Sequence, residues 1–175
     1  MAENIMIKGA RLSFPSLFKK AVFDGAEGKY EGTFLFPKSD KKTHKVIMDA
    51  IATIKSENKA KVGDDKLCIK DGDTIDYDGY EGMWAVKASN TKRPTVINRD
   101  KSPLTEDDEV LYAGCYVDVI INLWYQNNKF GKRVNANLLG VRFVKGGDPF
   151  GDGAKVADAD EFDDDDDYED DEDDF

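Results

Sequence analysis

The last 28 residues of the chain, 148–175, have a composition that cannot form a packed core. They contain 16 acidic residues and a single basic residue, Lys155, and the run 163–167 consists of five aspartates. The like charges repel one another, and almost no apolar surface is available for burial. We therefore expect a disordered acidic tail at residues 148–175 and a folded body formed by residues 1–147.

The body and the tail carry opposite net charges. The whole chain of 175 residues has a net charge of −11, but residues 1–147 hold 24 basic and 20 acidic residues. A mildly basic body attached to a strongly acidic tail suggests a polyanion as the ligand of the body. The tail itself has two interpretations. It is either a solubilising segment, or a flexible polyanion that imitates nucleic acid and presents the terminal aromatic residue, Phe175, to a partner.

Few residues of the types that build metal or redox sites are present. The chain has two cysteines without CxxC spacing, Cys68 and Cys115, and one histidine, His44. We expect buried free thiols in a reducing compartment, no zinc or histidine-based catalytic site, and no cofactor. The N-terminus lacks the pattern of a signal peptide, and no apolar run is long enough to span a membrane. The sequence therefore predicts a soluble, cytoplasmic protein without membrane association.

Alternation of apolar and polar residues predicts a protein that is mainly β. The clearest pattern spans residues 111–125, and it continues through a turn at 127–131 into a partner strand at 132–145. Valine, isoleucine and leucine form one face of the first strand, at positions Val117, Val119, Ile121 and Leu123. Further strands are expected at 4–14 (with a bulge at Gly9 and an end at Pro15), at 29–37, at 83–89 and at 95–98.

One amphipathic helix is predicted between these strands. Ser39 or Asp40 can cap a helix that runs to about Lys59, and its apolar residues recur at helical spacing. Strands, one helix and further strands in this order suit an OB-fold-like Greek-key β-barrel with the helix packed on it. Other α+β sheets have the same order of elements and stay open as alternatives.

The sequence contains no catalytic constellation. It has no glycine-rich phosphate loop and no nucleophile elbow. Four carboxylates in turns could hold Mg²⁺ in a nuclease, namely Asp71, Asp73, Asp76 and Asp78, but nothing else in the chain supports that chemistry. The same region fails the EF-hand pattern, which needs a glycine at its sixth and a glutamate at its twelfth position. We expect a binding protein and not an enzyme.

Aromatic residues recur beside basic residues in several parts of the body. Single-stranded nucleic acid is bound by this combination, because cations follow the phosphates while rings stack on the bases. The candidate DNA-binding residues are Arg11, Phe14, Lys19, Lys20, Tyr30, Lys38, Lys87, Arg93, Arg99, Tyr116, Trp124, Lys132 and Arg133. Each has a structural alternative, because surface lysines are abundant and rings such as Phe34, Phe36 and Trp84 fit a core better. Trp124 stands out, since alternation places it on a polar, cationic strand face.

The chain resembles a family at both of its ends. The segment 8–18, KGARLSFPSLF, is similar to the N-terminal signature of one group of bacteriophage single-stranded DNA-binding proteins, and the acidic end with Asp173, Asp174 and Phe175 resembles their tails. The resemblance implies an OB-fold body that coats single-stranded DNA during replication, recombination or repair in the host cell cytoplasm. It also implies a tail that contacts DNA polymerase or other replisome proteins, and in some members a homodimer formed by tail exchange.

Two hypotheses of different classes follow. In the first, the protein binds single-stranded DNA largely independently of sequence, and the tail competes with DNA at an effective concentration of about millimolar before it recruits replication proteins. RNA stays open as a ligand, because stacking hardly distinguishes the sugars. In the second, the tail is the active part, as a DNA mimic or a ligand for histone-like basic proteins, and the body is a scaffold.

Overall fold

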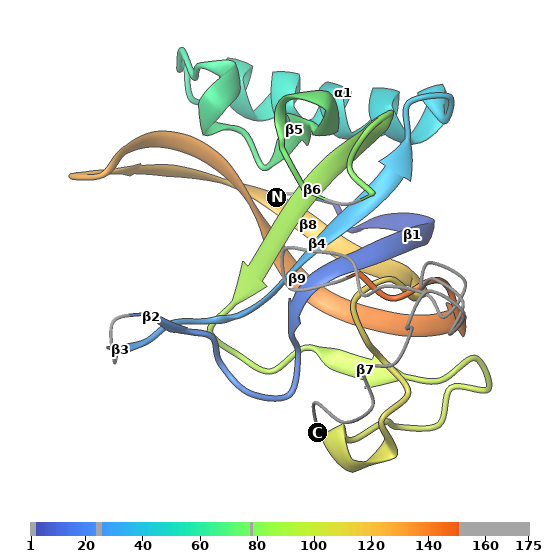
Figure 1. The fold of residues 1–175 in the computed structure, drawn as a ribbon. Coiled ribbons are helices and arrows are strands. Elements are labelled where there is room, and N and C mark those ends of the chain that lie inside the picture. Colours follow the sequence, from blue (N-terminus) through green and yellow to red (C-terminus); the bar gives the residue numbers. More distant parts are fainter. Residues whose placement is uncertain (1–2, 24–25, 78, 151–175) are drawn as a thin grey trace, which may run out of the picture.

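Five strands close into a barrel in the computed structural model, which describes residues 3–23, 26–77 and 79–150. They pair in the order β6–β4–β1–β8–β9, and β9 returns to β6 through a parallel contact (Figure 1). Their bounds are β1 Ile5–Ser16, β4 Tyr30–Pro37, β6 Met83–Asn90, β8 Tyr116–Asn128 and β9 Gly131–Lys145. This closed, OB-like barrel with one helix confirms the predicted fold class. The predicted disordered tail lies, from residue 151 onward, outside the described residues.

Shorter elements extend this barrel. The strands β2 (Val22–Phe23) and β3 (Ala26–Glu27) form a small separate hairpin. The strand β5 (Ile69–Asp71) pairs with β6, and β7 (Thr95–Ile97) pairs in parallel with β9. Three single-turn helices lie in the connections, η1 at Asp64–Lys66, η2 at Gly72–Thr74 and η3 at Glu106–Asp108. None of the helices that the structure describes is long and apolar enough to cross a membrane.

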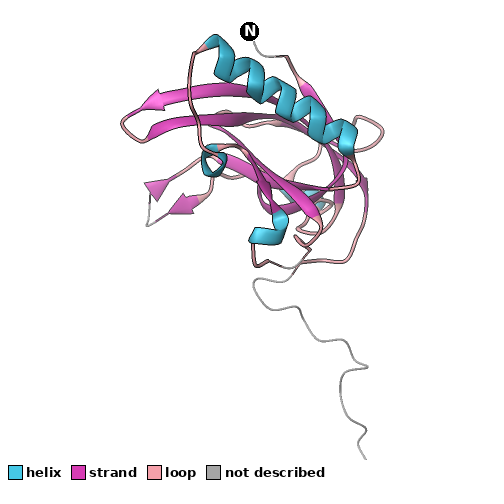
Figure 2. Cartoon of the chain, turned by 90° about the horizontal axis from the view of Figure 1, so that it is seen from above, coloured by secondary structure: helices cyan, strands magenta, loops and turns pink. Residues whose placement is uncertain are grey.

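The helix α1 (Lys41–Glu57) lies across one end of the barrel (Figures 1 and 2). The carboxylate of Asp40 accepts a hydrogen bond from the backbone N–H of Thr43 at 3.2 Å, which satisfies one of the unpaired amides at the helix start. The side chains of Ile47, Ile51 and Ile54 are buried beneath the helix. The predicted helix is confirmed, with Asp40 as its cap.

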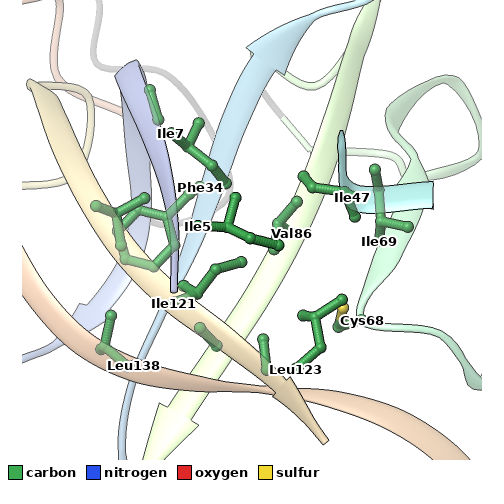
Figure 3. Close-up of a cluster of buried hydrophobic side chains, with 14 of the residues drawn as sticks. Ile5, Ile7, Phe34, Ile47, Cys68, Ile69, Val86, Ile121, Leu123 and Leu138 are labelled. Carbon is green, nitrogen blue, oxygen red and sulfur yellow. The ribbon is translucent and has the colours of Figure 1, made fainter. Parts of the chain in front are cut away.

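The barrel interior is filled by the apolar residues that alternate along its strands (Figure 3). Phe34 and Phe36 are fully or almost fully buried, as expected for core residues. Trp84 packs against this core but is only partly buried, and its ring stacks on His44 with the centroids 4.4 Å apart. Both cysteines are buried free thiols, and burial raises the pKa of Cys68 to about 12. At neutral pH this thiol is therefore protonated and unreactive.

The first strand deviates from the prediction at its end. Gly9 has a φ of 65°, and the pairing of β1 with β8 shifts there, which confirms the predicted bulge. The prediction that Pro15 ends the strand is wrong, since β1 runs on to Ser16. The pairing of β1 with β4 shifts between Ser13 and Ser16. Pro15 lies inside that irregular part, where its missing N–H removes no regular ladder bond.

The long hairpin is present, but its first strand begins later than predicted. Residues 111–115 are not strand, because a turn closes there with a hydrogen bond from Cys115 N–H to Tyr112 C=O at 3.2 Å. The pairing of β8 with β9 shifts once in its interior, between Ile120 and Ile121, opposite Gly140. The break of register in the hairpin therefore lies at Gly140.

We predict that Ile121→Ala lowers the free energy of unfolding by about 2–5 kcal/mol, because the truncation leaves a cavity in a packed barrel. Ile121 is fully buried at the centre of β8. Urea unfolding followed by circular dichroism measures the loss. The control is Val46→Ala on α1, whose side chain is 44% exposed, and whose effect should stay within about 0.5 kcal/mol. Equal effects of the two variants would contradict the assignment of Ile121 to the core.

Candidate nucleic-acid interface

An open cleft of about 920 Å³ crosses the face of the barrel that β4, β6 and the base of the β8–β9 hairpin present to solvent. Alternation along the strands explains which side chains reach it. On β4 the residues Phe34 and Phe36 point into the barrel, so Glu31 and Thr33 point outward and line the cleft. On β6, Lys87 lies between two buried neighbours and also faces the cleft.

Aromatic rings gather at one end of the cleft. The rings of Phe14 and Tyr77 meet edge to face at 4.9 Å between centroids, and those of Tyr77 and Tyr80 at 5.4 Å. Phe14 and Tyr77 are 51% and 56% exposed, whereas Tyr80 is buried and its hydroxyl shares a 2.7 Å hydrogen bond with Ser13. Phe150 completes this end of the cleft lining. Two exposed rings beside two anchored ones provide a platform on which bases can stack.

Phe14 holds a backbone conformation that bulky residues avoid. Its φ is 48°, in the left-handed region, at the irregular part of β1. This conformation costs an L-residue about 1–2 kcal/mol. The strained backbone directs the ring of Phe14 toward solvent and the cleft, where it contributes little to the core. Strained backbone of this kind clusters at functional sites. Because the ring of Phe14 adds little to the core, the strain at this residue points to a role in the cleft.

Trp124 lies at the other end of the cleft, on the hairpin. It is opposite Asn135 in the ladder between β8 and β9, and both side chains line the cleft together with Arg133. The predicted placement of Trp124, on the face opposite the buried Val117–Leu123 row, is confirmed. The amide of Asn135 donates a 2.8 Å hydrogen bond to Gln126, which holds the hairpin face beside the indole ring.

The cleft is cationic along its length. Its basic lining residues are Lys29, Lys66, Lys70, Lys87 and Arg133. Glu31 is the one acidic residue among the described residues that line it, and its carboxylate lies 3.3 Å from the ammonium of Lys87. The side chain of Glu31 is only 16% exposed while that of Lys87 is 64% exposed, so the cation faces the cleft. A polyanion entering the cleft therefore meets positive charge first.

Arg11 fastens the last described residues to the barrel. Its guanidinium donates hydrogen bonds to the carbonyls of Gly114 at 3.1 Å and Asp148 at 2.6 Å. The same group lies 4.1 Å from the ring centroid of Phe150, a cation–π contact. Phe150 packs beside Tyr80, and its backbone N–H donates to the carbonyl of Ala113 at 2.9 Å. Arg11 thus holds residues 148–150 against the barrel. Its contact with DNA stays a prediction.

Four of the thirteen predicted DNA-binding residues come together in the cleft: Phe14, Lys87, Trp124 and Arg133. Nine do not line it: Arg11, Lys19, Lys20, Tyr30, Lys38, Arg93, Arg99, Tyr116 and Lys132. Several of these contact other side chains. Lys19 lies 3.5 Å from Glu106, Arg93 lies over Phe18, and Tyr116 lies beneath Lys145. Arg99 and Lys132 are exposed. The role of each in binding stays a prediction.

Lys38 binds two of the carboxylates that the nuclease alternative would need. Its ammonium contacts Asp71 at 2.5 Å and Asp73 at 2.6 Å. These hydrogen bonds raise the pKa of Lys38 and lower the pKa of both aspartates. The described residues contain no group of histidine, cysteine or acidic side chains that could hold a metal ion. Asp78 lies outside the described residues.

The sequence reasoning missed several lining residues. Tyr77 and Tyr80 belong to a polar stretch whose pattern indicated only acidic turns, and Phe150 falls within the segment assigned to the tail. The lysines Lys29, Lys66 and Lys70 were also not among the candidates. The available signal was the pair Tyr77 and Tyr80 within an otherwise polar loop, because rings there have an apolar body that needs a partner.

A closed OB-like barrel with a cleft of rings and cations defines a protein of the class that binds single-stranded nucleic acids. A family model described as "Enterobacter phage Enc34, ssDNA-binding protein" matches residues 3–175. The chain belongs to this family of phage single-stranded DNA-binding proteins, which is a class of binding proteins and not of enzymes. The resemblance seen in the sequence and the expectation of a non-enzymatic protein are thereby confirmed.

Relatives support the assignment along most of the chain. The putative protein p50 of Acyrthosiphon pisum secondary endosymbiont phage 1 is 38% identical over 180 residues, which covers 91% of this chain and 92% of that protein. The single-stranded DNA-binding protein of bacteriophage Enc34, solved in complex with single-stranded DNA, is 39% identical with a TM-score of 0.80. That match covers 85% of this chain and 89% of the Enc34 chain. The single-stranded DNA-binding protein gp2.5 of bacteriophage T7 shares the fold, with a TM-score of 0.52 at 14% identity over 93% of this chain and 98% of the T7 chain.

We predict that Phe14→Gly is more stable than Phe14→Ala by about 1 kcal/mol, because only glycine relieves the left-handed backbone. Both variants lose the same ring, so both should bind a single-stranded oligonucleotide equally weakly, below the wild type. Urea unfolding and fluorescence anisotropy measure the two effects. An alanine variant as stable as the glycine variant would show that the backbone at Phe14 is not strained.

Proposed function

We propose that this protein binds single-stranded DNA in the cleft, largely independently of sequence and without catalysis. The observation that carries the proposal is one open cleft lined by the exposed rings of Phe14 and Tyr77, by the half-buried ring of Trp124 and by five basic residues. The solved complex of the Enc34 protein with single-stranded DNA supports it, because that protein shares 39% of its sequence and the same barrel.

The division of work within the cleft follows from its chemistry. The lysines and Arg133 attract phosphates, and their counterion release makes binding weaken as salt increases. The rings of Phe14, Tyr77 and Trp124 accept any base, since every base has a π-face. Duplex DNA offers no unstacked bases to these rings, so we expect it to bind weakly.

The ion pair of Glu31 and Lys87 determines where the phosphates of a bound DNA strand can lie in the cleft. The carboxylate of Glu31 repels phosphates, and it holds the ammonium of Lys87 on the solvent side. The sugar–phosphate backbone is therefore directed along the exposed lysines, and the bases turn toward the rings. The phosphates and the bases of a bound DNA strand therefore occupy different sides of the cleft.

We predict that Trp124→Ala weakens binding to a single-stranded oligonucleotide about tenfold, since stacking on one ring contributes about 1–3 kcal/mol per base. The matched control is Trp84→Ala, the other tryptophan, which stacks on His44 outside the cleft lining. Fluorescence anisotropy measures affinity, and circular dichroism checks that both variants are folded. An unchanged affinity of Trp124→Ala beside a folded spectrum would remove the cleft from the binding site.

We further propose that residues 1–147 form the DNA-binding domain, onto whose cleft Phe150 packs, and that the acidic residues after Phe150 in the predicted tail, 148–175, compete with DNA for it. Phe150 lines the aromatic end of the cleft and is held there by Arg11, so the acidic stretch follows directly from that end. A tethered polyanion at this place competes at a high effective concentration. We propose that Asp173, Asp174 and Phe175, once released by DNA, recruit DNA polymerase or other replication proteins.

We propose that the protein acts in phage DNA replication, recombination and repair in the host cytoplasm, as its resemblance to phage single-stranded DNA-binding proteins implies. We propose homodimerisation by tail exchange as the route by which a second copy would associate. Analytical ultracentrifugation of the full chain and of a chain ending at Phe150 tests this route, because only the full chain should dimerise. Dimers of both chains would place the dimer contact in the body.

We predict that a chain ending at Phe150 binds single-stranded DNA more tightly than the full chain, with the larger difference at low salt. Retaining Phe150 keeps the aromatic end of the cleft and its contact with Arg11 intact. Anisotropy titrations at two salt concentrations, with duplex as control, measure the effect. If neither chain binds, the acidic tail becomes the active part, and basic proteins are the partners to test.

A further inference from the structure

The β8–β9 hairpin extends beyond the end of the barrel and ends in an exposed phenylalanine. Both views show its tip clear of the rest of the fold (Figures 1 and 2). Phe130 is 69% exposed, the largest exposed fraction of any large apolar side chain that the structure describes. The ammonium of its neighbour Lys129 lies 5.1 Å from the ring centroid.

The turn itself does not need a phenylalanine. The carboxamide oxygen of Asn128 accepts hydrogen bonds from Phe130 N–H at 2.9 Å and from the Gln126 side chain at 3.2 Å. Gly131 supplies the positive φ, 105°, that returns the chain into β9. These two residues close the turn, and short polar residues are the usual choice between them. Phe130 therefore contributes no packing that would explain its place.

The hairpin is built as a stiff, cationic extension of the cleft. From Ile121 to Asn128 its pairing with β9 has no register shift. The face of Trp124 continues outward through Gln126 to Asn128, and the hydrogen bond from Asn135 to Gln126 links this face across the two strands. The outer part of the hairpin, residues 124–133, includes three basic residues, Lys129, Lys132 and Arg133, and no acidic residue. A single DNA strand that leaves the cleft at Trp124 would therefore follow this face of the hairpin to Phe130.

We propose that the β8–β9 hairpin is a wedge that opens duplex DNA where a bound single strand enters it, with Phe130 stacking on the first base pair of the junction. This inference rests on the proposed binding of single-stranded DNA in the cleft. Apolar side chains that insert at a base step partially unstack it and kink the duplex there. Here Lys129, whose ammonium lies near the ring, and the exposed Lys132 at the start of β9 attract the phosphates of both strands at the junction.

The test uses the full chain and a short duplex with an unpaired tail, in both polarities, labelled with a fluorophore and a quencher at the junction. We expect Phe130→Ala to slow junction opening about tenfold, which corresponds to the loss of one stacking contact. Phe130→Trp should restore opening. Val46→Ala, which truncates an exposed apolar side chain on α1, should open the junction as the wild type does.

Binding to a fully unpaired oligonucleotide separates this proposal from the proposed function. We expect Phe130→Ala to retain wild-type affinity for it, whereas Trp124→Ala loses affinity. If Phe130→Ala opens the junction at the wild-type rate, or loses affinity for unpaired DNA as strongly as it loses opening, the wedge is wrong and single-strand binding stands. If the wild type does not bind unpaired DNA at all, both proposals are wrong.

Discussion

The pairing of β8 with β9 is the interaction on which both the barrel and the cleft depend. One face of this ladder supplies the row Val117, Val119, Ile121 and Leu123 to the core, while the other carries Trp124 and its polar neighbours toward solvent. Because side chains alternate along a strand, a slip of one residue would bury Trp124 and expose the core row. The hydrophobic core therefore fixes the position of Trp124 in the cleft.

The cleft combines anchored and exposed rings with basic residues whose availability depends on their ion pairs. Tyr80 and Phe150 are anchored by Ser13 and Arg11, while Phe14 and Tyr77 stay exposed beside them. Glu31 holds Lys87, and Lys38 is neutralised by two aspartates outside the cleft lining. Basic residues are common in this chain, but ion pairing leaves only some of them available to a polyanion. This explains why the charge of a lysine by itself does not identify a binding residue.

The two ends of the cleft connect it to different parts of the protein. The aromatic end leads, through Phe150, to the acidic segment of the chain, which acts in the proposed function as a competitor of DNA. The other end leads, through Trp124, along the outer part of the hairpin, where residues 124–133 include no acidic residue, to Phe130. A DNA strand in the cleft would therefore compete with the acidic segment for the basic residues at one end. At the other end, the ring of Phe130 would be available to its next base. This polarity is a property of the fold, since the competitor and the ring come from distant parts of the sequence.

Periodicity along the sequence determined much of the architecture by itself. It placed the helix after Ser39 or Asp40, the bulge at Gly9, the long hairpin and the outward face of Trp124, because these depend on local conformation and on burial along one element. The family was visible in two short segments at the chain ends. Only the tertiary structure decided that Tyr77, Phe150 and Lys66 line one cleft with Phe14, that Lys38 is paired, and that Pro15 lies within β1. These facts depend on which distant segments meet when the barrel closes, and no local pattern records such contacts.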